Sequence, residues 1–440
     1  MCEREVYKTL KYNRSITVAS GLYELLNHKI LLSDAQEILS MKKLSIADVH
    51  PELRHMANRI PSFAVTSGNL WWWRFLSSLV GVPKPTQDVL VENIFIPGRD
   101  KDTKIRLRVY KPASMQGLVP GMVWFHGGGY VFGKPEMNDR SCIQFVREAG
   151  IVVVSVDYRC APRHAFPVAL EEGYAALQWV HSRGRQLGMD NRIAVGGASA
   201  GGGLAAALAQ VAYDRKEISI QGQILVYPML DDRTVLRTDI EHGFMTWGQA
   251  SNRFGWESYL NARCGSDDLP AYAVPARRAD LSGLPPAWVG VGTLDLFHDE
   301  DVTYAQRLKA SGVECELHIV PGVFHGFDVV TQKAAVVREF QRSQLAALKK
   351  YLFPAEQKFT AVDMIVGKQY RVVKPFTDFD GRVHDSGESW IFTGKNFLPY
   401  DDGLTVYVKR DDRDHTFRMQ WRDEAQGNII SHFSDYVDEE

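Results

Sequence analysis

The sequence has no long hydrophobic run and almost no net charge. None of its apolar stretches approaches the roughly 18 residues that a membrane-spanning helix requires. The formal net charge is −2 over 440 residues, so no overall field favours nucleic acid, acidic substrates or a membrane surface. We therefore expect neither a nucleic-acid partner nor stable insertion into a membrane.

Cysteines are also few. The five of them are scattered and show no metal-binding spacing. The first residues, 1–5, lack the basic-then-apolar order of a signal peptide. We expect reduced, mostly buried thiols in a cytoplasmic protein that holds no metal or other cofactor. The cysteines are Cys2, Cys142, Cys160, Cys264 and Cys315.

The pattern of apolar residues predicts three regions of different secondary structure. Residues 1–90 are expected to be helical, with a capping-box pattern at 33–36 and an apolar helix at 67–80. That second helix carries Trp71, Trp72 and Trp73. Adjacent indoles point in different directions on a helix. They either pack on a neighbouring layer or line the mouth of a binding site.

Residues 91–355 are expected to form an α/β domain. Stretches 91–96 and 104–110 alternate polar and apolar residues, as in a half-exposed antiparallel pair. Short continuous apolar runs with helical segments between them then predict a mostly parallel sheet covered by helices on both faces. The apolar runs are 122–125, 151–154, 193–195, 224–226 and 288–291, and the helical segments are 140–149, 169–185, 201–213 and 299–310.

Two segments depart from this alternation. Residues 231–270 form an insertion with Trp247, Trp256 and Tyr259, and an insertion at the carboxyl edge of such a sheet either walls a pocket or is a surface excursion. After a helix at 333–352, residues 358–440 have strand-like runs separated by turn residues and predict a small all-β domain. Its acidic tail, 435–440, is expected to be frayed.

A Gly-x-Ser-x-Gly pattern at residues 197–201 is the strongest indication of chemistry. An apolar strand precedes it and an Ala-rich helix follows, which is the context of a nucleophile elbow. A serine at such a sharp turn projects from the sheet, and flanking glycines avoid clashes. The alternative is a small-residue loop that only connects two elements. We predict that Ser199 is a nucleophile.

A serine nucleophile needs a base, and the base needs a group that orients it. Asp295 and His325 each follow a strand-like run, so both are expected at the same sheet edge as Ser199. The order Ser, Asp, His is that of α/β-hydrolases. Each residue also has a structural alternative, since an aspartate after a strand often caps a helix and a lone histidine is usually structural.

An oxyanion hole is predicted next to the nucleophile. The sequence His-Gly-Gly-Gly follows a buried strand, and glycines let backbone N–H groups approach a developing negative charge. We expect Gly127, Gly128 and Ala200 to supply these donors. A phosphate-binding loop is the rival interpretation, but no Lys-Ser/Thr pair follows. For His126 we favour a hydrogen bond that pins the loop over a role as a second base.

With these residues in view, residues 90–350 resemble the hormone-sensitive lipase family of esterases. The resemblance rests on four motifs in the family's order, at 126–129, 197–202, 295–300 and 324–327. Residues 157–162, continuing to 166–167, also match a structural segment of that family. The resemblance implies an α/β-hydrolase fold with an N-terminal helical cap (1–90), a catalytic domain (91–355) and a Ser-His-Asp carboxylesterase. Members usually prefer short acyl chains, so short- to medium-chain esters are the expected substrates. Many members dimerise, which leaves a homodimer open.

The sequence departs from the family at one position and leaves other functions open. Ala198 stands where the family usually has Asp, so a hydrogen bond behind the serine is expected to be lost. A ligand-binding receptor and a dehydratase that uses the same pocket are alternatives, although plant gibberellin receptors have lost the base that His325 supplies here. The β-rich region 358–440 is similar to a small domain of unknown function, which also allows a protein that acts mainly through that domain.

Overall fold

The computed structural model of the chain contains two compact units, Met1–Leu352 and Phe353–Glu440. The structure describes residues 45–60, 64–79, 87–98, 103–238, 246–354, 360–398, 403–422 and 426–439. The predicted capping box at 33–36 lies outside these residues. The unit boundaries given in the preceding subsection, including the helical cap, remain predictions.

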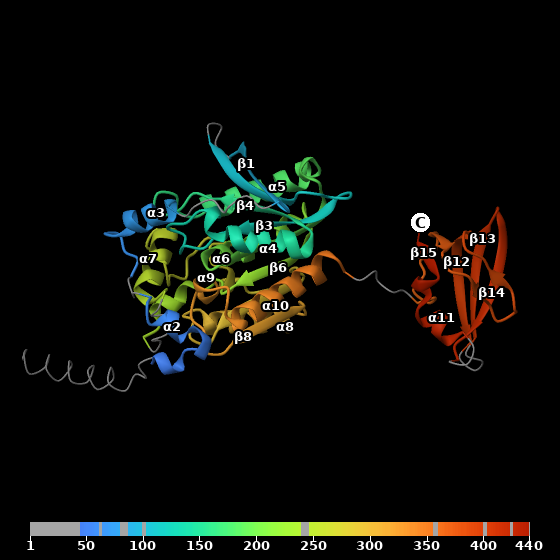
Figure 1. Cartoon of the computed structure of the whole chain (residues 1–440). Coiled ribbons are helices and arrows are strands. Elements are labelled where there is room, and N and C mark those ends of the chain that lie inside the picture. Colours follow the sequence, from blue (N-terminus) through green and yellow to red (C-terminus); the bar gives the residue numbers. More distant parts are fainter. Residues whose placement is uncertain are drawn as a thin grey trace, which may run out of the picture. The chain divides into compact units, whose positions relative to one another are not determined.

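The first unit is built on an eight-stranded sheet with the order β1-β2-β4-β3-β5-β6-β7-β8 (Figure 1). β2 pairs antiparallel with β1 and β4, and the neighbours from β4 to β8 are parallel. The mostly parallel sheet expected from the sequence is confirmed. The strands are β1 (Val89–Pro97), β2 (Lys104–Pro112), β3 (Val119–Phe125), β4 (Val152–Asp157), β5 (Met189–Ala198), β6 (Ile220–Val226), β7 (Ala287–Gly292) and β8 (Cys315–Val320).

Helices cover both faces of this sheet. Buried residues of α5, α6 and α8 share one apolar cluster, and those of α4 and α10 share the other. The α-helices of this unit are α2 (Arg54–Ala57), α3 (Leu70–Ser78), α4 (Asp139–Ala149), α5 (Val168–Arg183), α6 (Ala200–Arg215), α7 (Gln249–Tyr259), α8 (His298–Ala310), α9 (Phe327–Val330) and α10 (Ala335–Leu352). Short 3-10 turns lie at η1 (Ile46–Asp48), η2 (Pro51–Leu53), η3 (Pro135–Asn138), η4 (Gly184–Leu187), η5 (Asp232–Leu236) and η6 (Pro275–Arg277).

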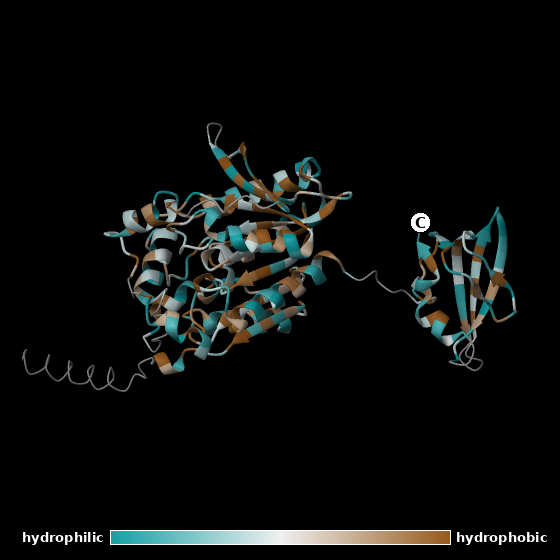
Figure 2. Ribbon diagram, in the orientation of Figure 1, coloured by the Kyte–Doolittle hydropathy of each residue, from teal (hydrophilic) through white to brown (hydrophobic). Residues whose placement is uncertain are grey.

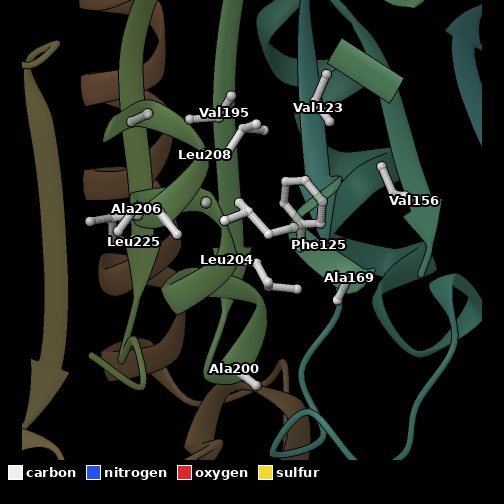
Figure 3. Packing of buried hydrophobic residues seen from close by; sticks show 14 of the residues in the cluster. Val123, Phe125, Val156, Ala169, Val195, Ala200, Leu204, Ala206, Leu208 and Leu225 are labelled. Atoms are coloured by element: carbon white, nitrogen blue, oxygen red, sulfur yellow. The ribbon is translucent and has the colours of Figure 1, made fainter. Parts of the chain in front are cut away.

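The apolar runs are continuous because both faces of each central strand are covered. In β3, Val123 and Phe125 belong to the cluster under α5 and α6, whereas Met122 and Trp124 belong to the cluster under α4 and α10. Figure 3 shows Leu204 and Leu208 of α6 among the side chains of the first cluster. The outer pair β1–β2 is antiparallel, as the sequence predicted, and carries both hydrophilic and hydrophobic residues (Figure 2).

One predicted helix is shorter than expected. The helix placed at 67–80 begins at Leu70 and ends at Ser78, because Thr66 to Asn69 form a turn. The Asn69 side chain closes that turn: its Oδ1 accepts from Thr66 N at 2.8 Å, and its Nδ2 donates to the Ala64 carbonyl at 2.8 Å. These local bonds compete with helical ones, as Asn commonly does before a helix.

The second unit is mainly an antiparallel sheet, as predicted. Five strands run in the order β14-β13-β12-β9-β15, and β10 pairs with β11 in a separate hairpin. A cluster that includes Tyr370, Trp390 and Phe417 forms its own core. The elements are β9 (Gln369–Val372), β10 (Phe376–Thr377), β11 (Val383–His384), β12 (Ser389–Leu398), β13 (Gly403–Arg410), β14 (Arg413–Gln420), α11 (Gly427–Ser431), η7 (Phe433–Asp435) and β15 (Val437–Glu439).

The prediction of a frayed acidic tail is wrong for its described residues. Val437 pairs with Val372 of β9, and its side chain is fully buried in the core of the second unit. Apolar burial and backbone pairing outweigh the repulsion between the exposed carboxylates that surround Val437, because those charges remain in water.

No helix within the described ranges is long and apolar enough to cross a membrane. The four described cysteines are all free. Cys142 and Cys315 are buried, whereas Cys160 and Cys264 are half-buried. Burial raises the pKa of the Cys160 and Cys315 thiols to about 12, so both are protonated at neutral pH.

A buried ion pair ties β2 to the start of α4. Arg108 donates from Nε and Nη2 to the two carboxylate oxygens of Asp139, both at 2.8 Å, and the Tyr110 hydroxyl donates to the same carboxylate at 2.5 Å. Arg108 and Asp139 are each 3% exposed. Removing one partner would leave the other charge buried without compensation.

We expect Arg108→Met to destabilise the first unit by about 3 to 5 kcal/mol, the usual cost of orphaning one member of a buried pair. The matched control is Arg147→Met. Arg147 also forms a two-pronged pair, with Asp88, but on the surface, so its loss should cost about 1 kcal/mol or less. Urea unfolding measures both variants. Equal costs would show that burial does not set the strength of the Arg108 pair.

Candidate active site

Ser199 occupies a strained turn between β5, which ends at Ala198, and α6, which begins at Ala200. Its φ is +58° and its ψ −123°, a conformation that is unfavourable for a residue with a side chain. Glycines make the turn possible: a Cβ on Gly197 would lie 2.3 Å from the Gly201 carbonyl oxygen, and one on Gly201 would lie 2.2 Å from the Phe125 carbonyl oxygen. The structure therefore has the strand–turn–helix shape of a nucleophile elbow.

Backbone hydrogen bonds hold this turn in place. Ser199 N donates to the carbonyl of Val226 at the end of β6 at 2.9 Å, and the Ser199 carbonyl accepts from Met229 N at 3.0 Å and Gly203 N at 3.1 Å. The strained residue is thus fixed from the neighbouring strand as well as from its own helix.

The structure brings the three predicted residues of the triad together. His325 Nε2 lies 2.9 Å from Ser199 Oγ, and His325 Nδ1 lies 2.8 Å from Asp295 Oδ2. Asp295 is fully buried, while Ser199 and His325 are each 6% exposed. Because β7 and β8 are parallel neighbours with Gly292 opposite Val320, the loops that follow them leave the sheet at one edge.

Asp295 is oriented by its own turn. Its Oδ1 accepts from Phe297 N at 2.9 Å, which leaves Oδ2 for the imidazole. Two aromatic rings then enclose the histidine: the centroid of Tyr227 lies 4.6 Å and that of Phe297 5.1 Å from the imidazole centroid, both edge-on. Tyr227 is itself fixed by a 2.7 Å hydrogen bond from its hydroxyl to Asp328.

The loop that carries His325 is bound to an early segment of the chain. His50 N donates to the Gly322 carbonyl at 2.7 Å, and Gly322 N donates to Thr293 Oγ1 at 2.8 Å. A Cβ on Gly322 would lie 2.8 Å from His50 N, so only glycine allows this close approach. This contact could not be predicted from the sequence, because no local pattern links residues 272 positions apart.

The predicted oxyanion residues lie beside Ser199. A Cβ on Gly127 would be 3.3 Å from Ser199 Cβ, and Ala200 is the first residue of α6. Gly128 has a φ of +121°, and a Cβ there would lie 2.0 Å from the Phe132 carbonyl oxygen. None of the backbone hydrogen bonds in the described turns, loops and caps uses the N–H groups of Gly127, Gly128 or Ala200. These three groups stay the candidate donors to an oxyanion.

His126 has the contacts expected of a residue that pins the loop. It is fully buried, its Nδ1 donates to the Gly127 carbonyl at 2.8 Å, and its ring stacks on Tyr158 with centroids 4.2 Å apart. The Tyr158 hydroxyl donates to the His126 carbonyl at 2.8 Å. Burial lowers the pKa of His126, which favours the neutral ring.

Helix α3 is bound to the same loop through a residue that sequence analysis missed. Arg74 donates to the Val131 carbonyl at 3.0 and 3.1 Å and to the Ala161 carbonyl at 2.9 Å. The sequence indicated this role only by placing one charged residue, Arg74, within the otherwise apolar first part of α3. Of the three neighbouring tryptophans, Trp73 packs on Phe132, whereas Trp71 and Trp72 are exposed, as expected for indoles that point in different directions.

Two further carboxyl groups lie near the beginning of α8. Glu300 accepts from Leu230 N at 2.7 Å and from the Thr234 hydroxyl, whereas neither oxygen of Asp301 has a hydrogen-bond partner among the described residues. Burial raises the pKa of both groups well above their usual range, and the charge of Asp295 adds to the effect at Asp301. Burial therefore favours the neutral form of Asp301 in the folded protein.

Within the described ranges, no cluster of three or more His, Cys, Asp or Glu side chains is arranged to hold a metal ion. What the site does contain is a serine on an elbow, a buried Ser-His-Asp chain of hydrogen bonds and an edge of a mostly parallel sheet. Together they define the class of α/β-hydrolases.

Comparison with known proteins agrees with that class. The family model described as "alpha/beta hydrolase fold" matches residues 122–329. Carboxylesterase NlhH of Mycobacterium tuberculosis is 33% identical over 69% of this chain and 97% of its own length. The solved structure titled "Bacterial Heroin Esterase" is 34% identical, with a TM-score of 0.66 over 70% of this chain and 99% of that one. The chain belongs to the hormone-sensitive lipase family of carboxylic ester hydrolases.

Two other matches bear on the remaining questions. Gibberellin receptor GID1B of Arabidopsis thaliana is 32% identical over 50% of this chain and 64% of its own length, so the family also contains a receptor. A second family model, for a domain of unknown function (DUF3601), matches residues 339–439. That match begins inside α10 of the first unit, ahead of the predicted boundary at 358.

The pKa of Asp301 predicts a pH-dependent cost. Its pKa in the folded protein lies above the ordinary value of 3.8, so the unfolded chain loses this proton first as pH rises. Asp301→Asn should therefore stabilise the protein increasingly above about pH 4, with a gain at pH 8 of up to about 1.4 kcal/mol for each unit by which the folded pKa exceeds the unfolded one.

Thermal or urea unfolding across this pH range measures the gain. The control is Asp267→Asn, at an exposed carboxylate, which should leave the pH dependence unchanged. A gain from Asp301→Asn that does not vary with pH would contradict a raised pKa for Asp301 in the folded protein.

Proposed function

We propose that the enzyme hydrolyses carboxylic esters through an acyl intermediate on Ser199, with His325 as general base and Asp295 as the group that orients it. The observation that supports this most strongly is a chain of two hydrogen bonds, 2.9 and 2.8 Å long, that joins Ser199 Oγ to Asp295 through the imidazole. These distances are within the range required for proton transfer.

In the first half of the reaction, Ser199 Oγ attacks the ester carbonyl carbon while its proton moves to His325 Nε2. The tetrahedral intermediate collapses when the bond to the alcohol oxygen breaks, and Nε2 returns the proton to that oxygen. The alcohol leaves, and the acyl group stays on Ser199. Water then attacks the acyl carbon and gives a proton to Nε2. The bond between the acyl carbon and Ser199 Oγ breaks, Nε2 passes that proton to Oγ, and the carboxylic acid leaves.

Asp295 acts through the histidine. It accepts the Nδ1 proton, which fixes the tautomer that presents a bare Nε2 to the serine, and it stabilises the imidazolium that forms in each half-reaction. Its complete burial strengthens this interaction, because the nearby dielectric constant is low.

The N–H groups of Gly127, Gly128 and Ala200 are proposed to bind the oxyanion of both tetrahedral intermediates. The positions of these residues support this proposal. Gly127 borders Ser199, and Ala200 begins the helix whose N-terminus carries a partial positive charge. Backbone donors of this kind stabilise charge that develops only in the transition state.

For substrates we propose small esters with short to medium acyl chains, as the family resemblance implies. A cytoplasmic location is supported by the free thiols of Cys142, Cys160, Cys264 and Cys315, which are typical of a reducing compartment. For a homodimer the support is the family resemblance alone.

Two other functions remain to be separated from ester hydrolysis. A receptor would bind its ligand without turnover, and the hydrogen bond that Ser199 Oγ donates to His325 Nε2 argues for catalysis instead. A dehydratase would use the same pocket for elimination. Release of p-nitrophenol with a kinetic burst, over esters from acetate to palmitate, distinguishes acyl transfer from both alternatives.

Ser199→Ala should lower turnover by about 10⁶-fold, because it removes the group that is acylated. The control is Ser182→Ala, at a partly exposed hydroxyl that bonds to its own helix, and it should keep full activity. An organophosphate adduct mapped by mass spectrometry to a serine other than Ser199 would contradict the assignment.

A chain that ends at Pro354 should keep ester turnover within about twofold of the full-length enzyme, because compact units generally keep their own core and site. All triad residues and the whole of α10 lie in the first unit. Turnover per titrated serine is the measurement. A folded truncation that loses most of its activity would assign the second unit a part in catalysis.

A further inference from the structure

Thr246 and Trp247 lie just ahead of α7 and contact two different parts of the proposed active site: the backbone of His325 and the glycine loop. The Thr246 hydroxyl donates a hydrogen bond to the backbone carbonyl of His325. The next residue along the chain after His325 is Gly326, with a φ of +71°. A glycine lets the neighbouring peptide plane rotate easily, so a bond to the His325 carbonyl restricts the peptide that follows the Cα carrying the imidazole.

Trp247 contacts the other side, the glycine loop. Its indole is 5% exposed, and a Cβ on Gly129 would lie 2.0 Å from Cη2 and 2.4 Å from Cζ2 of the indole. The far edge of the ring therefore lies directly on Gly129, the residue that follows the two proposed oxyanion donors Gly127 and Gly128. Removing that edge would open a gap into which the loop could move.

Helix α7 supports this contact from behind. A Cβ on Gly255 would lie 2.8 Å from the Gly129 carbonyl oxygen, and Tyr259 stacks on Tyr130 with centroids 4.1 Å apart. Tyr130 also donates from its hydroxyl to the Met229 carbonyl at 3.1 Å. Gly129 therefore contacts both α7 and the indole, and the indole also lies against Gly255 of α7, so a change at Trp247 acts on the position of Gly129.

We propose that Thr246 and Trp247 are positioning residues that set the distance between the base and the oxyanion donors. Because they are adjacent in the chain, a single peptide unit connects the backbone of His325 to the glycine loop. This inference rests on the proposed function of the site. Its physical basis is that small displacements of catalytic groups are costly: a shift of about 1 Å can reduce rates about 100-fold.

Thr246→Val tests the hydroxyl, because valine keeps the shape and removes the donor. Titration of the acylated serine by the burst of an activated ester counts the competent sites. Per titrated site, we expect kcat to fall about tenfold while KM stays within about twofold, since the hydrogen bond acts on the reacting groups and not on substrate binding. Thr246→Ser should restore most of the loss.

The control is Thr331→Val. Thr331 Oγ1 accepts only from Lys333 N among the described bonds, in a turn of the same unit, so its loss should leave kcat per site unchanged. Trp247→Phe is the second variant: phenylalanine keeps an aromatic ring but is too short to reach Gly129, and it should give the same fall in kcat.

Three results would overturn the proposal. One is a Thr246→Val variant that keeps the wild-type kcat per titrated site, whether or not the number of titrated sites falls. That outcome would mean that the hydroxyl is merely structural. Another is a Thr246→Ser variant that loses as much kcat as Thr246→Val. The third is a Trp247→Phe variant with wild-type kcat. Failure of the ester mechanism itself would appear differently, as absence of a burst in the unmodified enzyme.

Discussion

The active site depends on a residue held in an unfavourable backbone conformation. Ser199 adopts a φ of +58°, and the turn persists because its N–H is bonded to Val226 on the next strand and its carbonyl to two further N–H groups. Such strain, of order 1 to 3 kcal/mol, survives only where the surroundings leave no alternative. The parallel sheet supplies those surroundings, and small residues at 197 and 201 let the helix approach the strand closely enough to do so.

The other groups of the site are placed by the same sheet edge but are secured by separate contacts. Asp295 is fixed by a hydrogen bond within its own turn. His325 is enclosed by two aromatic rings, and its loop is held by the hydrogen bond between His50 and Gly322. The glycine loop is held by His126, Arg74 and α7. Each contact is ordinary in strength. Because they converge on one serine, the geometry of the hydrogen-bonded chain is determined from several directions, which is the condition for preorganised catalysis.

Much of this arrangement could be predicted from the sequence because the relevant patterns are local. Continuous apolar runs identified the central strands, and the position of Asp295 and His325 directly after strands placed them at the edge that holds Ser199. The contacts that could not be predicted are those between distant segments, such as His50 with Gly322 or Thr246 with His325. Val437 was missed for the same reason: its acidic neighbours suggested solvent exposure, and its partner strand is 65 residues earlier.

The bond between His50 and Gly322 has a consequence for how the enzyme is made. A ribosome synthesises residue 50 long before residue 322, so the early segment must wait for its partner while the sheet assembles. Since the histidine that follows Gly322 is also the last of the three reacting groups to emerge, a nascent chain acquires esterase competence late. A chain that ends before residue 325 lacks both this contact and the base, so it cannot complete the triad.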